Sequence, residues 1–164
     1  MEKQRTERQF NTIQLTFLVI TRVLIGWHFL FEGLSKLLNP GWTSFGYLMD
    51  SKGFMAGFYQ SMASNPATLE IIDIMNTWGL IAIGTGLVLG ILTRWATVFG
   101  ALLLTLYYFS HPPLIGYDYA IPSGGNFFIV DKTLIELFTL LLLFVFPTGK
   151  IVGLDRLIFN KKKR

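Results

Sequence analysis

The stretch from Thr21 to Leu38, TRVLIGWHFLFEGLSKLL, decides how the rest of the chain is interpreted. It is apolar and long enough to lie in a bilayer, yet it contains Arg22, His28, Glu32 and Lys36. An ionisable group in hydrocarbon costs several kcal/mol unless it is paired or reaches water. Residues of this kind are therefore expected to have a partner or a function, and we look for a site along this helix.

Helical spacing arranges these residues on particular faces. At 100° per residue, His28, Glu32 and Lys36 form one stripe with the spacing i, i+4, i+8. Gly26 and Gly33, seven residues apart, open a second groove that another helix could approach closely. The pattern predicts a polar seam inside a membrane helix.

Composition sets the class of protein. The chain has 164 residues, of which 52% are hydrophobic and 15% charged, whereas about a quarter are charged in soluble domains. This length fits one domain over residues 1–164. The net charge of +4 comes from basic residues grouped in the segments KQRTER and KKKR near the two ends. We interpret them as a topology signal that favours a lipid bilayer and not nucleic acid as partner.

The chain has no cysteine. This excludes disulfides, iron–sulfur clusters, thiolate metal sites and covalently attached haem. The first apolar run is long, is interrupted by charges and lacks a small-x-small cleavage site, so we expect it to remain as an anchor and not to be a cleaved signal peptide.

Four apolar segments predict an all-α, polytopic membrane protein, a four-transmembrane-helix bundle. Prolines at Pro40, Pro112 and Pro147 end three of them. The expected helices and the two longer loops have these bounds: helices at about 13–38, 71–92, 95–110 and 127–146; loops at 39–70 and 111–130.

Loop charges predict the orientation of the bundle. Arg94 lies in the short turn between the second and third helices, and the termini are basic. The loop 112–130 contains neither Lys nor Arg. The positive-inside rule then places both termini and the short turn in the cytoplasm, and the longer loops outside. In the first of these loops, Phe54, Phe58 and Met62 share a helical face, which fits either a surface cap or a short helix on the outer membrane surface.

Polar residues from all the predicted helices are expected at one level beneath the outer surface. The first helix brings His28, Glu32 and Lys36, while Arg22 is placed near the midplane by counting residues. The other helices bring the following residues to this side: Asp73, Asn76, Trp78, His111, Asp131, Lys132 and Glu136. Lys132 and Glu136 have the i, i+4 spacing of an ion pair. Convergence of this kind is typical of a binding site in a membrane protein.

Each residue also has a structural explanation. Lys36 and Lys132 could extend to the interface with no ligand, and His28 could be a core histidine bonded to another helix. Two histidines on different helices could also ligate a haem. Glu32 and His28, one turn apart, could pass a proton and are the candidate catalytic pair. Arg22 either pairs with an acid such as Glu136 or Glu32, or holds an anionic or carbonyl-bearing ligand. It is expected to turn into the bundle.

Four motifs in order resemble the DoxX/DoxD family of small membrane proteins. The first is R-x3-G-x2-F-x3-G-x2-K, from Arg22 to Lys36. The second is a glycine-rich helix that closes on a Thr-Arg turn, GTGLVLGILTR. The others are GNFFIVDKTLIE, which carries Asn126, Lys132 and Glu136, and the tail GKIVGLD at 149–155.

The resemblance implies a four-helix bundle in the bacterial inner membrane. Its best-described members are the membrane subunit of thiosulfate:quinone oxidoreductase, and other relatives accompany redox or surface systems. Applied here, the resemblance implies a quinone as ligand and a membrane or periplasmic subunit as partner. The expected ligand-binding residues are Arg22, Lys36, Trp78, His111, Asn126, Lys132 and Glu136, with no metal ligand among them.

Three functions remain open from the sequence. The first is a redox-linked subunit that binds a quinone-like headgroup in the outer half of the bundle, and that would be an oxidoreductase of the thiosulfate:quinone type if it is an enzyme. Such an enzyme needs a redox relay, and no residue of the sequence supplies one. The second is a non-catalytic assembly partner of another protein complex, in which the buried ions serve helix packing. The third is the handling of lipid or a small solute along the polar seam.

Overall fold

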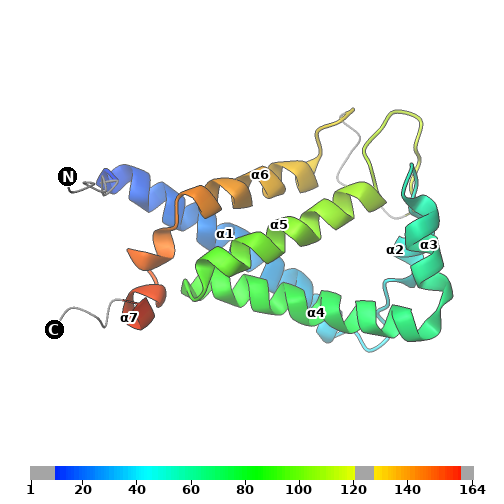
Figure 1. Cartoon of the computed structure of the whole chain (residues 1–164), viewed down its shortest axis with the longest axis horizontal. Coiled ribbons are helices and arrows are strands. Elements are labelled where there is room, and N and C mark those ends of the chain that lie inside the picture. Colours follow the sequence, from blue (N-terminus) through cyan, green and yellow to red (C-terminus); the bar gives the residue numbers. More distant parts are fainter. Residues whose placement is uncertain (1–9, 121–127, 160–164) are drawn as a thin grey trace, which may run out of the picture.

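The computed structural model describes residues 10–120 and 128–159, and its helices follow one another without a strand in the described part of the chain (Figure 1). In chain order they are α1 (Thr12–Leu37), α2 (Phe45–Met49), α3 (Ala56–Ser64), α4 (Pro66–Leu89), α5 (Thr93–Ser110), α6 (Lys132–Val145), a 3-10 helix η1 (Thr148–Lys150) and α7 (Asp155–Phe159). The all-helical prediction is confirmed for these residues.

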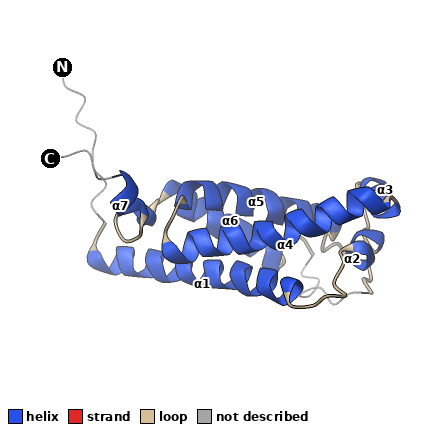
Figure 2. Ribbon diagram, turned by 90° about the horizontal axis from the view of Figure 1, so that it is seen from below, coloured by secondary structure: helices blue, strands red, loops and turns tan. Residues whose placement is uncertain are grey.

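The long helices α1, α4, α5 and α6 run along the molecule and pack as an up-and-down bundle (Figures 1 and 2). α1 packs mainly against α4, and α6 packs mainly against α5. The short helices α2 and α3 lie at one end, and α7 lies at the other, which is also the end where α1 begins (Figure 1). We call the end with α2 and α3 the cap end and the opposite end the tail end.

Apolar runs located the helices, but two starts were predicted wrongly. α4 begins at Pro66, five residues before the predicted 71, because the Asn65 side chain caps the backbone N–H groups of Ala67 and Thr68. α6 begins at Lys132, where the Asp131 side chain accepts from the backbone N–H of Leu134 at 2.8 Å. Residues 128–131 are not helical, and the predicted start at 127 lies outside the described residues.

Glycines bring α1 and α4 into backbone contact, as their spacing predicted. A Cβ on Gly26 would lie 2.9 Å from the backbone nitrogen of Val88, and a Cβ on Gly33 would lie 2.9 Å from that of Ile81. On α4, a Cβ on Gly84 would lie 2.4 Å from the backbone nitrogen of Leu30. In a bilayer the hydrophobic effect does not drive helices together, so tight packing depends on small residues that let the backbones approach closely. This contact fixes the rotation of α1 and therefore the direction of its polar stripe.

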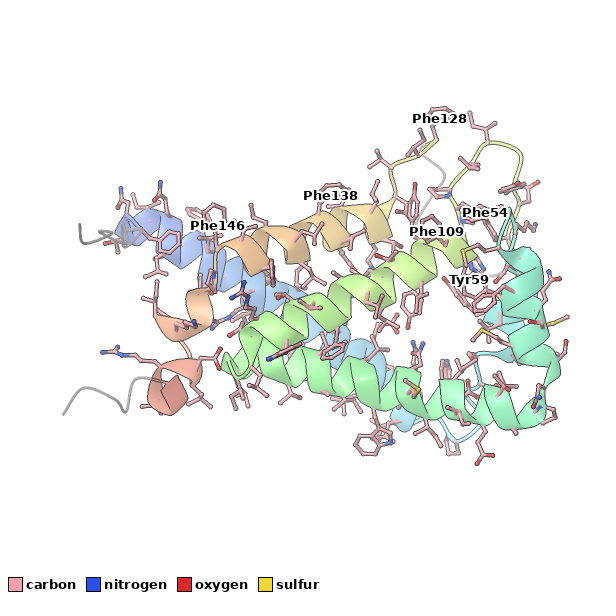
Figure 3. The ribbon with its side chains drawn as sticks, in the orientation of Figure 1. Phe54, Tyr59, Phe109, Phe128, Phe138 and Phe146 are labelled. Atoms are coloured by element: carbon pink, nitrogen blue, oxygen red, sulfur yellow. The ribbon has the colours of Figure 1, made fainter. Side chains whose placement is uncertain are left out.

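Large apolar side chains cover the outside of the bundle as well as its core. Phe29, Leu87 and Leu140 are buried between the helices, whereas Phe138 on α6 is 63% exposed and points away from the bundle (Figure 3). α1 and α4 are long and apolar enough to cross a membrane. An apolar outer surface on helices of this length is what a bilayer requires, and a soluble surface would be mostly polar there.

The C-terminal tail closes the tail end of the bundle through Asp155. Its carboxylate accepts from the backbone N–H of Leu92 at 2.7 Å, from that of Thr93 at 3.1 Å, and from the Thr93 hydroxyl. It thereby caps the start of α5, where Leu92 adopts a left-handed conformation with φ 48°. The backbone N–H of Asp155 donates to the carbonyl of Gly90 at 2.8 Å. One residue of the tail therefore joins the end of α4 to the start of α5.

The cap end has a small apolar cluster of its own, made by Leu48, Tyr59 and Ala63. The Tyr59 hydroxyl donates to the carbonyl of Leu106 at 2.8 Å and so ties α3 to α5. Phe54 stands clear of this cluster and is exposed at the surface (Figure 3). A helix in the loop 39–70 was one of the two sequence predictions. α3 confirms a helix that contains Phe58 and Met62, but it begins at Ala56, after Phe54.

Candidate functional site

Lys36 is held inside the bundle by polar and aromatic partners. Its Nζ donates to Asn76 Oδ1 at 2.9 Å and lies 3.6 Å from Glu32 Oε2. The Asn76 amide then donates to the Tyr107 hydroxyl at 2.7 Å. The ammonium also lies over the ring of Trp42, 4.9 Å from its centroid. The Lys36 side chain is only 14% exposed, so it does not extend away from the bundle.

His28 and Glu136 connect α1 to α6. Nε2 of His28 lies 3.4 Å from Oε1 of Glu136, and Lys132 Nζ lies 3.8 Å from the same oxygen. The predicted i, i+4 pair of Lys132 and Glu136 is therefore present. The histidine therefore faces a carboxylate of a neighbouring helix. This carboxylate is Glu136, whereas Glu32 was predicted.

Glu32 lies between these two groups. It pairs with Lys36 and lies within electrostatic range of Glu136 and Tyr107. Its side chain is 48% exposed, and that of His28 is 37% exposed. We define the seam site as His28, Glu32 and Lys36 of α1, Asn76 of α4, Tyr107 of α5, and Lys132 and Glu136 of α6. Because the His28 and Glu32 side chains are partly exposed, a molecule in the bilayer could reach the imidazole and this carboxylate.

The charges of the seam site are internally balanced. Each of its two lysines is paired with a glutamate, Lys36 with Glu32 and Lys132 with Glu136. A small dianion needs cations that are not already neutralised by carboxylates. The site instead offers hydrogen-bond donors and acceptors next to titratable groups, an arrangement suited to a neutral polar headgroup and to proton transfer.

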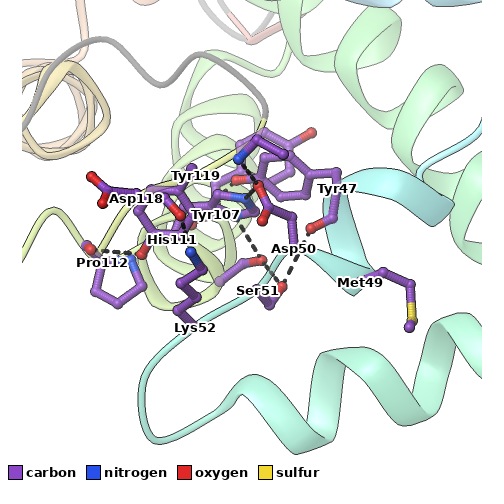
Figure 4. A network of polar contacts seen from close by, with 12 residues as sticks. Tyr47, Met49, Asp50, Ser51, Lys52, Tyr107, His111, Pro112, Asp118 and Tyr119 are labelled. Carbon is purple, nitrogen blue, oxygen red and sulfur yellow. Dashed lines mark hydrogen bonds and ion pairs between the residues drawn. The ribbon is translucent and has the colours of Figure 1, made fainter. Parts of the chain in front are cut away.

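His111 belongs to a second polar network at the cap end (Figure 4). Its ring stacks on Tyr47 with centroids 3.9 Å apart, and Tyr119 covers it at 4.6 Å. Nδ1 lies 3.1 Å from the Ser110 hydroxyl, and Nε2 lies 3.9 Å from Asp50 Oδ2. Burial lowers the pKa of His111, and the neighbouring Asp50 opposes that shift.

Tyrosines connect this network to the seam site. The Tyr47 ring meets the Tyr107 ring edge to face at 5.8 Å, and the Tyr47 hydroxyl donates to the Tyr107 carbonyl at 3.4 Å. Burial raises the pKa of Tyr47 well above its ordinary value, and burial also raises the pKa of Tyr119 to about 12. Both hydroxyls are therefore protonated hydrogen-bond donors at neutral pH.

Arg22 turns into the bundle, as predicted, and is 3% exposed. The predicted partner, Glu136 or Glu32, is wrong. Nη1 of Arg22 donates to the Thr148 hydroxyl at 3.1 Å, and the acid in electrostatic range is Asp155. The predicted level near the midplane is also wrong: Arg22 lies at the tail end, beside Thr148 and Gly90. Counting residues ignored that α1 extends beyond α4 and α6 at this end (Figure 1). Arg22 lies about 21 Å along α1 from Lys36, so we leave it out of the seam site.

One more predicted residue, Trp78, does not join the seam site. Trp78 is exposed on the side of α4 opposite its buried residues, so its indole faces away from Asn76. Asn126 lies outside the described residues.

Four neighbours were not predicted from the sequence: Tyr107 and Trp42 beside Lys36, and Thr148 and Asp155 beside Arg22. A tyrosine inside an apolar run has no separate pattern, whereas Asp155 could have been identified as the acid that closes the last family motif. Asn76 was assigned to the outer level but not to the site.

Comparison with known protein families matches residues 17–112 to DoxX. The chain belongs to the DoxX family. The matched region contains the α1 stripe, Asn76 and Tyr107, and the family assignment agrees with the apolar outer surface of the bundle. No curated protein and no solved structure matches the chain.

Proposed function

We propose that this DoxX protein is a four-span subunit of the bacterial inner membrane that binds a quinone-like headgroup at the seam site. In this proposal, residues 1–164 form one domain, α1, α4, α5 and α6 each cross the bilayer, and the termini are cytoplasmic. The loop charges and the outward apolar side chains support this arrangement. α6 has 14 residues, about 21 Å of helix, so we expect the bilayer to adapt beside it.

The topology can be tested with engineered thiols because the chain has no cysteine. We expect a membrane-impermeant maleimide to label Ser61→Cys on α3 in intact cells. We expect Lys150→Cys in η1 to be labelled only after the membrane is permeabilised. Both positions are exposed, so a difference between them reports sidedness. Labelling of Lys150→Cys in intact cells would contradict the orientation.

The observation that supports a quinone-like ligand is the seam site itself. Its charges are balanced, and the Glu32 carboxylate and the His28 imidazole are partly exposed. A quinone headgroup is neutral, accepts hydrogen bonds at its carbonyls and takes up protons when it is reduced. Lys36 and His28 are the donors that would hold such carbonyls, and Glu32 and Glu136 are the groups that would deliver protons. An apolar tail would remain in the bilayer next to α1 and α6, whose outer faces are apolar.

The same observation argues against thiosulfate as a ligand of this chain alone. Both seam-site lysines are paired with glutamates, and Arg22 lies at the tail end. In a thiosulfate:quinone type of reaction, this chain would bind the quinone and transfer protons. A partner subunit would bind the sulfur compound and pass its electrons to the quinone.

Binding of a quinone analogue to the purified protein tests this proposal. We expect Lys36→Met to weaken binding by about 10- to 100-fold, because a hydrogen bond from a charged donor is worth roughly 1.5–3 kcal/mol. We expect a similar loss in Glu136→Gln, because this change removes the carboxylate that lies next to the donor His28. Affinity is measured by titration in lipid nanodiscs.

Glu70→Gln is the matched control. Glu70 lies on α4 at the same end of the bundle and is exposed, so this variant makes the same charge change outside the seam site. Its affinity should equal that of the wild type. Equal affinities in all four proteins would contradict the site.

A second candidate is a non-catalytic assembly partner. It is favoured by the pairing of the seam-site ions with one another and by exposed apolar residues at the cap end, such as Phe54 and Ile115. It predicts that the same seam-site variants lower stability without changing ligand affinity, and that a constant protein companion is recovered with the chain.

A further inference from the structure

Residues 112–120 form a strap that crosses the cap end and is fastened to the segment after α2. The backbone N–H of Ala120 donates to Asp50 Oδ2 at 2.8 Å. Lys52 Nζ donates to the carbonyl of Asp118 and lies 5.1 Å from the Tyr119 ring centroid (Figure 4). Asp50 and Lys52 therefore hold the end of the strap.

His111 is the common packing partner of the three segments that meet here. It ends α5, stacks on Tyr47 of α2, and is covered by Tyr119 of the strap. The residue is 7% exposed, and its buried Nε2 has no hydrogen-bond partner among the described residues. The nearest acid is Asp50, at 3.9 Å, which is beyond hydrogen-bond distance. Its carboxylate is already used by the Ala120 backbone.

We propose that neutral His111 keeps the strap closed, and that protonation of His111 from the outer side releases it. A buried imidazolium here would have two N–H donors. Nδ1 has the Ser110 hydroxyl as a partner, whereas Nε2 has none among the residues that the structure describes. The charged groups that face it are Asp50, which favours the cation, and Lys52, which opposes it. The phenols of Tyr47 and Tyr119 contribute no negative charge at neutral pH.

The sign of the effect follows from burial. The pKa of His111 is lowered in the closed strap, chiefly by burial, whereas a solvent-exposed histidine has its ordinary value of 6.5. Closed-strap stability is therefore present above pH 6.5 and is lost as the pH falls through the lower value. Opening would uncover Tyr47 and, behind it, the Tyr107 end of the seam site. The proposal does not depend on which ligand the seam site binds.

Spin labels on two engineered cysteines test the release directly. One label replaces the exposed Asp118, whose contact with Lys52 uses the backbone oxygen, and the other replaces Ser61 on α3. We expect the distribution of distances between the labels to have one short, narrow peak at pH 8. At pH 5 we expect it to become broader and to shift to longer distances. An unchanged distribution between these two pH values would overturn the proposal.

Two variants assign the effect to His111. His111→Phe retains a ring between Tyr47 and Tyr119 but cannot be protonated, so its distance distribution should be the same at both pH values. His28→Gln removes the other histidine of the chain and should keep the full pH response. A pH response that survives in His111→Phe would assign the change to another group and overturn the proposal.

Should His111→Phe fail to fold, the wild-type histidine can be titrated by NMR. With His28→Gln as background, one histidine remains to be observed. The proposal requires a pKa below 6.5 for His111, and a value at or above 6.5 would overturn it.

Discussion

Replacing Gly84 with alanine is expected to destabilise the bundle by about 3 kcal/mol or more, because overpacking costs typically 1–3 kcal/mol and more where nothing can yield. The new Cβ would lie 2.4 Å from the backbone nitrogen of Leu30 and 2.7 Å from the carbonyl oxygen of Gly26. These are backbone atoms of α1, so relief requires that α1 moves away from α4. Because α1 carries His28, Glu32 and Lys36, the seam site would be displaced as well.

Gly79→Ala is the control on the same helix. A Cβ at Gly79 would meet nothing within 4 Å, and alanine is a better helix former than glycine by about 1 kcal/mol. We therefore expect Gly79→Ala to be as stable as the wild type or slightly more stable. Thermal unfolding in mild detergent, with monodispersity as a second readout, measures both. Equal stability of the two variants would contradict the close α1–α4 contact.

Replacing Asp155 with alanine is expected to cost about 2–4 kcal/mol of stability, since it leaves buried donors without partners and removes the acid near a buried arginine. The lost acceptor serves the backbone N–H groups of Leu92 and Thr93 and the Thr93 hydroxyl. Arg22 would keep its bond to Thr148 but lose the only counter-charge assigned to it among the described residues. The α4–α5 turn should loosen first.

Arg156→Ala is the matched control for this prediction, because it also removes a charge from α7 but at an exposed position. It should leave the unfolding temperature unchanged. The double variant Arg22→Met with Asp155→Ala should cost less than the sum of the two single changes if the two charges interact. An additive result would show that the two charges do not interact. An Asp155→Ala protein as stable as the wild type would show that the tail does not close the bundle.

The helices and their packing surface could be predicted from the sequence because each follows from a local pattern. Apolar length predicted the bundle helices, and prolines predicted three of the helix ends. The Gly26–Gly33 spacing predicted the face of α1 that another helix approaches, and the structure shows that this helix is α4. The first residues of α4 and α6 could not be predicted from hydropathy because they depend on capping. Asn65 and Asp131 begin their helices by side-chain hydrogen bonds that hydropathy does not report.

The site was predictable only for residues whose position follows from their own helix. The stripe on α1 and the Lys132–Glu136 pair are of this kind. The place of Arg22 depended on how far α1 extends beyond its neighbours, and that of His111 depended on how the strap folds over α5. Neither is encoded in a local spacing. Arg22 was therefore assigned to the wrong level, and His111 was assigned to the seam site although it belongs to a neighbouring network.

We propose above that the seam site holds a quinone-like headgroup in the native membrane. The most direct measurement is native mass spectrometry of the protein extracted with its own lipids, with the bound small molecules identified after release. We expect a quinone to be retained by the wild-type protein and by Glu70→Gln, and to be lost from Glu136→Gln and Lys36→Met. A wild-type protein that carries phospholipid but no quinone when taken from quinone-containing membranes would contradict it, as would equal retention by all four proteins.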